Sequence, residues 1–197
     1  MSQVKISGNA SGTGVLTIAA PNTNTDRSIT IPDKAGAIAV GAGTIVQVVQ
    51  GTTSTEVAIT GTTYTDTGLT ASITPTSSSN KVLIFVNQPF NSARDVVDHG
   101  FGMKLLRGST EILIPTRVTS TAGPLSFFFD NSNNDWGHIN FSYLDSPSTT
   151  SSTTYKTTAR PYFDSNNGVI RLQRGSSSAV YDQNPTSTIT LMEVVAW

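Results

Sequence analysis

Two short polar segments carry residue types that bind metal ions. Asp95 and His99 are four residues apart and would share one face of a helix, and a carboxylate with an imidazole is a frequent ligand pair. Residues 131–135 are rich in Asn and Asp, which offer oxygen ligands for calcium, but they lack the alternating acids and the closing Glu of a calcium loop. A solvated loop and a turn between strands explain these segments more simply. We therefore expect no metal and no cofactor.

Trp136 and His138 are the residues whose types best fit a ligand site. An indole face beside hydrogen-bonding side chains is the chemistry of a carbohydrate site. The alternative is that these strand residues belong to the core, where aromatic side chains in strands usually lie. Both readings stay open at the level of sequence.

The catalytic motifs that a sequence reveals are missing from this chain. It has no Gly-x-Ser-x-Gly elbow and no Gly-Lys-Ser/Thr phosphate loop. Its three glutamates, Glu56, Glu111 and Glu193, would need an Asp partner to form a glycosidase pair. We expect a protein that is not an enzyme, with a polysaccharide depolymerase as the third choice of function.

The composition favours an all-β protein. Only 13% of the 197 residues are charged, while 24 are Ser and 30 are Thr. Thr is β-branched and suits strands, and Ser suits turns. A net charge of -1 provides no excess with which to bind nucleic acid. No 18-residue apolar run and no signal-peptide pattern occur. We therefore expect that the protein is made in a cytoplasm and that it does not insert into a membrane.

Residues 44–197 are predicted to form a jelly-roll-type β-sandwich, because short apolar runs recur at sandwich spacing. Residues 81–88 are apolar on both faces and should form a central strand. Residues 107–110 have the glycine and the length of a hairpin turn, and residues 92–99 are predicted to supply two turns of helix. A Thr-rich segment marked by Tyr64, Leu69 and Ile73 is expected to follow the first strand. The other expected strands are 45–50, 101–106, 111–115, 125–130, 137–144, 153–160, 169–174 and 188–195.

Residues 1–43 are predicted to form a separate N-terminal β arm. Its large apolar residues are too few to offset the ordering of some forty residues, so the arm needs a partner to fold against. That partner would be its symmetry mates, a larger particle or the body of its own subunit. The expected docking or oligomerisation residues of the arm are Val15, Leu16, Ile18, Ile29 and Ile31.

The segment from Gly14 to Asp33, GVLTIAAPNTNTDRSITIPD, resembles one near the start of many structural proteins of tailed bacteriophages, especially their capsid-fibre-like and tail-fibre-like proteins. Residues 64–75, residues 144–156 and the ending from Ser187 resemble the bodies of such proteins. The resemblance touches most of the chain. It implies a homotrimeric virion protein.

The body is also similar to the trimeric jelly-roll heads of the tumour-necrosis-factor and complement type. That resemblance implies a final strand near the three-fold axis, with Ile189, Leu191, Val194 and Trp197 in the core or in the subunit contact. The chain departs from long phage fibres in its length, because only about 43 residues precede the body.

The sequence therefore leads to the hypothesis of a homotrimeric virion structural protein. It would be anchored by its arm to phage capsid or tail proteins, as a capsid decoration or a short tail fibre, with the head exposed on the virion surface. The alternative is a glycan-binding adhesion head that contacts host surface polysaccharide through Trp136 and His138.

Overall fold

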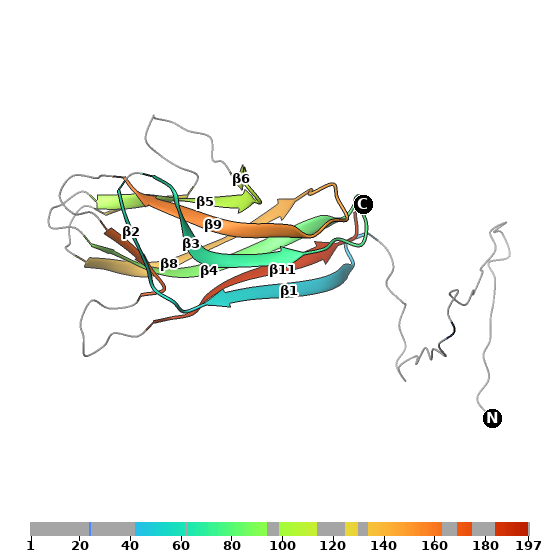
Figure 1. Ribbon diagram of the computed structural model, residues 1–197, viewed down its shortest axis with the longest axis horizontal. Helices are drawn as coiled ribbons and strands as arrows, with labels where there is room; N and C mark the ends of the chain where they lie inside the picture. Colours follow the sequence, from blue (N-terminus) through green and yellow to red (C-terminus); the bar gives the residue numbers. More distant parts are fainter. Residues whose placement is uncertain are drawn as a thin grey trace, which may run out of the picture. The chain divides into compact units, whose positions relative to one another are not determined.

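Figure 1 shows a computed structural model of the chain, which describes residue 24 and residues 42–61, 63–93, 99–113, 125–129, 134–162, 169–174 and 184–196. The chain divides into two units, Met1–Ile38 and Ala39–Trp197. The predicted docking residues Val15, Leu16, Ile18, Ile29 and Ile31 and the predicted contact residue Trp197 lie outside the described residues. The N-terminal arm and its boundary at residue 43 therefore stay predictions.

The described residues form strands and no helix, which confirms the all-β prediction. The strands are β1 (Ile45–Thr53), β2 (Val57–Thr60), β3 (Thr65–Ile73), β4 (Lys81–Ala93), β5 (His99–Arg107), β6 (Thr110–Leu113), β7 (Leu125–Phe129), β8 (Asn134–Asp145), β9 (Thr153–Pro161), β10 (Val169–Leu172) and β11 (Ser187–Val194).

These strands form two antiparallel sheets that pack as a β-sandwich (Figure 1). We call the six-stranded sheet, with the order β1-β11-β4-β10-β2 and β8 paired to β4, sheet A. The five-stranded sheet, with the order β3-β9-β5-β6 and β7 paired to β5, is sheet B. In sheet A, the long strand β4 pairs with β8 along one edge and with both β11 and β10 along the other.

Alternation of buried and exposed residues explains why the strands form a sandwich. In β11 the residues from Ser187 to Glu193 alternate between buried and half-buried, as expected when one face of a sheet covers the core. The inward side chains form two clusters. One surrounds Ile84, Tyr155 and Leu191, and the other surrounds Phe90, Phe101 and Ile170.

Two glycines fit positions where a side chain would interfere. A Cβ atom on Gly51 in β1 would lie 2.0 Å from the backbone oxygen of Thr70 in β3, so the two strands approach closely only because this residue has no side chain. Gly108 has φ of +59° at the first central position of the two-residue turn between β5 and β6. This turn confirms the predicted hairpin at residues 107–110.

The structure corrects two predictions about local elements. The helix predicted at residues 92–99 is wrong at both ends, because Ser92 and Ala93 pair with β8 as the end of β4 and His99 pairs with β7 at the start of β5. Residues 94–98 lie outside the described residues. No separate strand was predicted at Val57–Thr60, but these residues form β2, which pairs with β10.

Candidate functional site

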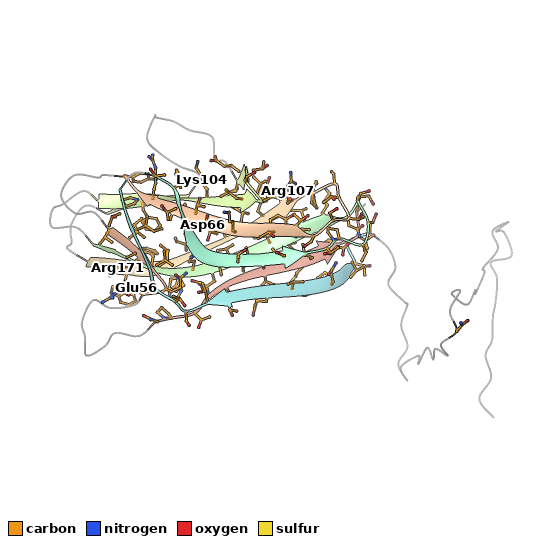
Figure 2. The ribbon with its side chains drawn as sticks, viewed as in Figure 1. Glu56, Asp66, Lys104, Arg107 and Arg171 are labelled. Atoms are coloured by element: carbon orange, nitrogen blue, oxygen red, sulfur yellow. The ribbon has the colours of Figure 1, made fainter. Side chains whose placement is uncertain are left out.

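The outer face of sheet B carries charged side chains on β3, β5, β6 and β9, whereas three rows on the outer face of sheet A carry none. The outer face of sheet B carries ion pairs between Lys104 and Glu111 and between Lys156 and Asp66, the second at 2.9 Å. Figure 2 shows Lys104 and Asp66 on the layer that contains β5, β9 and β3. Pairs that are this exposed contribute little to stability, but they keep a face well hydrated. The described side chains of β3, β5, β6 and β9 thus form an ordinary solvated surface on sheet B.

The outer face of sheet A has a different composition, which follows from the register of β1, β11, β4 and β8. These strands place their outward side chains in three consecutive rows. The first row is Val48, Met192, Leu83 and Leu144; the second is Gln50, Thr190, Phe85 and Ser142; the third is Thr52, Thr188, Asn87 and Asn140. None of these twelve residues is ionisable.

The first row, which we call the apolar row, is an uncharged hydrophobic surface in a single subunit. Val48 is 56% exposed and Leu144 is 38% exposed, with Met192 and Leu83 half-buried between them. Ile45 and Val46 at the start of β1 are also about half exposed. Contiguous apolar surface of this kind marks interaction sites on soluble proteins.

The apolar row lies near the point where the polypeptide enters the sandwich. The backbone N–H of Gly43 donates to the carbonyl of Val195 at 2.9 Å, and the N–H of Val195 donates to the carbonyl of Thr44 at 2.9 Å. These bonds extend the pairing of β1 with β11 by one step beyond Ile45. The first residues of the body, its last residues and the apolar row therefore share one end of sheet A, opposite to β2 in Figure 1.

The second and third rows contain a shallow cavity of about 380 Å³ between β11, β4 and β8. Its outward side chains are Phe85, Asn87, Asn140, Ser142 and Thr188, and it is completed by Val86 and Phe141, whose side chains pack toward the core. We call this cavity the polar groove. Phe85 is 43% exposed, so an aromatic ring is available to a ligand beside two amides and two hydroxyl groups.

Trp136 and His138 lie on the same outer face, beyond the polar groove. His138 is opposite Pro89 and Trp136 is opposite Asn91 in the pairing of β8 with β4. Trp136 is 71% exposed, so its ring is not part of the core. The Nδ1 atom of His138 lies 3.1 Å from the Oδ1 atom of Asn87, which joins His138 to the groove.

Arg107, Asp145 and Tyr155 tie the two sheets together at the end near the apolar row. The Nη1 atom of Arg107 in β5 contacts both carboxylate oxygens of Asp145 in β8, at 3.0 and 2.9 Å, and the hydroxyl of Tyr155 in β9 donates to the same carboxylate at 2.7 Å. Burial, together with the bond to Asp145, raises the pKa of Tyr155 above its usual value. The cluster is a structural link across the sandwich.

Glu193 forms a second buried polar cluster, on the inner side of β11. Burial alone would raise its pKa, but hydrogen bonds from Asn80, Gln47 and Thr76 outweigh this effect and lower the pKa to about 2. Asn80 Nδ2 donates at 2.6 Å, and the backbone N–H of Thr76 donates at 2.7 Å. Glu193 thus fixes the segment between β3 and β4 with neutral donors.

Glu56 anchors the other end of sheet A. Its two carboxylate oxygens each accept a 2.7 Å bond, one from Arg171 in β10 and one from Arg174 (Figure 2 labels Glu56 and Arg171). Burial would raise the pKa of Glu56, and the two arginines lower it below its usual value. Glu56, Arg171 and Arg174 are therefore paired with one another within the subunit.

The structure separates the residues that the sequence had grouped as core or trimer contact. Ile189 and Leu191 are fully buried in the core, and Val194 is 7% exposed. The outward residues of this strand are Thr188, Thr190 and Met192, and Met192 lies in the apolar row. The groove residues were missed because each is an unremarkable Asn, Ser, Thr or Phe in the sequence, and only the strand register brings them together.

Most of the residues that were considered as metal ligands, and not favoured, are outside the structure's description. Asp95 and residues 131–133 lie outside the described residues. Within the described ranges, no cluster of three or more His, Cys, Asp or Glu residues is placed to hold a metal ion. The same part of the chain contains no helix long and apolar enough to cross a membrane.

No protein-family model matches the chain. A search of curated proteins finds no match either.

Proposed function

We propose that this chain is a structural protein of a tailed-bacteriophage virion, made in the host cytoplasm and displayed on the particle as a homotrimeric capsid decoration or short tail fibre. The N-terminal arm would dock to capsid or tail proteins, and the sandwich head would be exposed. The observation that carries the proposal is the apolar row of Val48, Met192, Leu83 and Leu144, at the end where the polypeptide enters the body.

The physical argument is that this row needs a partner. Water around exposed Val, Leu and Met side chains raises the free energy of the isolated subunit, and removing their apolar surface from water recovers about 25 cal/mol per Å². Because the row carries no charge, the same surface on another copy would meet it without electrostatic repulsion. Both sheets carry ion pairs, but those of sheet A, between Glu56 and the arginines Arg171 and Arg174, lie at the end opposite to the apolar row.

We also infer that the sandwich is a jelly roll, and the strand pairing supports this. β1 and β2 pair with β11 and β10, and the last two share one edge of β4. β6 and β7 likewise share one edge of β5. We count β1 with β2, β6 with β7, and β10 with β11 as three interrupted strands. The first strand, β1 with β2, then pairs with the last, β10 with β11, while β3 pairs with β9 and β4 pairs with β8. A long hairpin rolled up on itself gives this pairing.

The native mass of the purified full-length chain tests the assembly. We expect light scattering after gel filtration to give about three times the 20.8 kDa subunit mass at micromolar concentration. A monomer under these conditions would contradict the proposal. The virion assignment is tested separately by labelling intact particles with antibody against the head, where an absence of label from both capsid and tail would refute it.

A second candidate function is a glycan-binding adhesion head for host surface polysaccharide. The observation that favours it is the polar groove beside Phe85. The two functions are compatible, because a virion protein can assemble at one end and recognise a host at the other.

A further inference from the structure

We propose that the polar groove on sheet A is a binding site for a neutral saccharide, with Phe85 as the stacking platform and Asn87 and Asn140 as the main hydrogen-bonding groups. This places the ligand site in the second and third rows, closer to the middle of the sheet than Trp136. The inference rests on the second candidate function, glycan recognition, and does not depend on the virion assignment or on the number of subunits.

The size and shape of the groove suit a small ligand. Its volume of about 380 Å³ lies at the lower end of the range for ligand sites. The strands β11, β4 and β8 that form it are hydrogen bonded to one another along its length, so its floor is a rigid sheet. A rigid floor reduces the entropy lost on binding.

The side chains of the groove have the hydrogen-bonding capacity that sugar hydroxyl groups need. Asn87 and Asn140 are directly opposite in the pairing of β4 and β8, which places their Cβ atoms about 5 Å apart. Each amide offers donors and an acceptor, and neighbouring hydroxyl groups of a sugar require both. Among the described residues, the side chains of Asn140, Ser142 and Thr188 make no hydrogen bond to protein, so they are available to a ligand.

Asn87 is held in place by a neighbour. His138 Nδ1 lies 3.1 Å from its Oδ1 atom, which leaves the Nδ2 group of Asn87 to donate to a ligand. Phe85, two residues before Asn87 on the same face, presents an exposed ring to the apolar C–H face of a sugar. One aromatic face beside convergent amides and hydroxyl groups is the combination that a pyranose ring requires.

The charge of the groove selects among sugars. None of its lining residues is ionisable, His138 beside it contacts Asn87, and Arg171 and Arg174 are paired with Glu56. An acidic sugar would lose hydration without gaining a cationic partner. The expected ligand class is therefore neutral hexose or N-acetylhexosamine chains, and not uronic or sulfated polysaccharide.

The test is a titration of the full-length protein with maltotetraose, cellotetraose and chitotetraose, in which binding is measured by NMR or calorimetry. Trigalacturonate is the acidic comparison. We expect saturable binding of at least one neutral probe and none of trigalacturonate. Phe85→Leu and Asn140→Ala should each weaken that binding roughly tenfold. Ser72→Ala, an exposed change on sheet B, is the matched control and should leave binding unchanged.

Several results would overturn the inference. They are an absence of binding by all neutral probes, tighter binding of the acidic probe, and unchanged affinity in both groove variants. A changed native mass in Phe85→Leu and Asn140→Ala with unchanged sugar binding would show that the groove is a subunit contact instead. Thermal unfolding of each variant checks that it is folded, and because both substituted residues are exposed, we expect wild-type midpoints.

Discussion

Glu193 shows how a buried carboxylate is stabilised without a cation. Its carboxylate accepts bonds from the amides of Asn80 and Gln47 and from the backbone and hydroxyl of Thr76. Hydrogen bonds to the charged form favour ionisation even where burial opposes it. No local pattern indicated this cluster, because its members are up to 146 positions apart and meet only through the pairing of β11 with β1 and with β4.

The lowered pKa of Glu193 predicts a dependence of stability on pH. The pKa is about 2 in the folded state and 4.5 when unperturbed, so the ionised form stabilises the fold above pH 4.5. This contribution, roughly 3 kcal/mol in the free energy of unfolding, is lost as the pH falls from 4.5 toward 2. In Glu193→Gln we expect lower stability at pH 7 and a shallower acid dependence, measured by urea unfolding.

Glu111→Gln is the control for this prediction. Glu111 pairs with Lys104 on the exposed face of sheet B, so its loss should change stability by less than about 1 kcal/mol. Equal acid dependence of wild type and Glu193→Gln would show that Glu193 does not carry the effect.

At the scale of elements, the close approach of β1 and β3 depends on Gly51. In Gly51→Ala the added methyl group would overlap the backbone oxygen of Thr70, so one strand must shift. We expect a loss of about 1–3 kcal/mol in the free energy of unfolding. Thr52 is an exposed neighbour of Gly51, and Thr52→Ala should lower the free energy of unfolding much less. Similar losses in the two variants would contradict the close packing.

The strands were predictable where their patterns were long. Residues 81–88 are apolar on both faces, and the prediction of a central strand is confirmed, because β4 is hydrogen bonded along both edges. Its outer face is not covered within the subunit, since Phe85 is 43% exposed. The apolar pattern on this face therefore does not correspond to burial within the described part of the chain.

Local signals failed where long-range pairing decided the structure. Ser92 has the type of a helix N-cap, but Ser92 and Ala93 pair with Asp135 and Asn134 across sheet A, and this pairing extends β4. The four residues of β2 are too few to show a period of their own. They form a strand because β10 provides an edge beside them.

At the scale of the whole molecule, the body has two different ends on one sheet. The apolar row lies near the entry of the chain, and the exposed ring of Trp136 lies eight residues farther along the paired strands, about 26 Å away. No sequence pattern indicated this arrangement, because the rows combine β1, β11, β4 and β8. This arrangement allows subunits to assemble through the apolar row while a ligand binds farther along the same sheet.

The most direct test of the central claim compares the native mass of Val48→Asp with that of Ser72→Asp, both exposed substitutions that add one negative charge. Val48 lies in the apolar row, and Ser72 lies on the outer face of sheet B. If the apolar row is the subunit contact, Val48→Asp will lower the mass from three subunits to one while Ser72→Asp leaves it at three. Equal masses for the two variants, or dissociation by Ser72→Asp alone, would contradict the account.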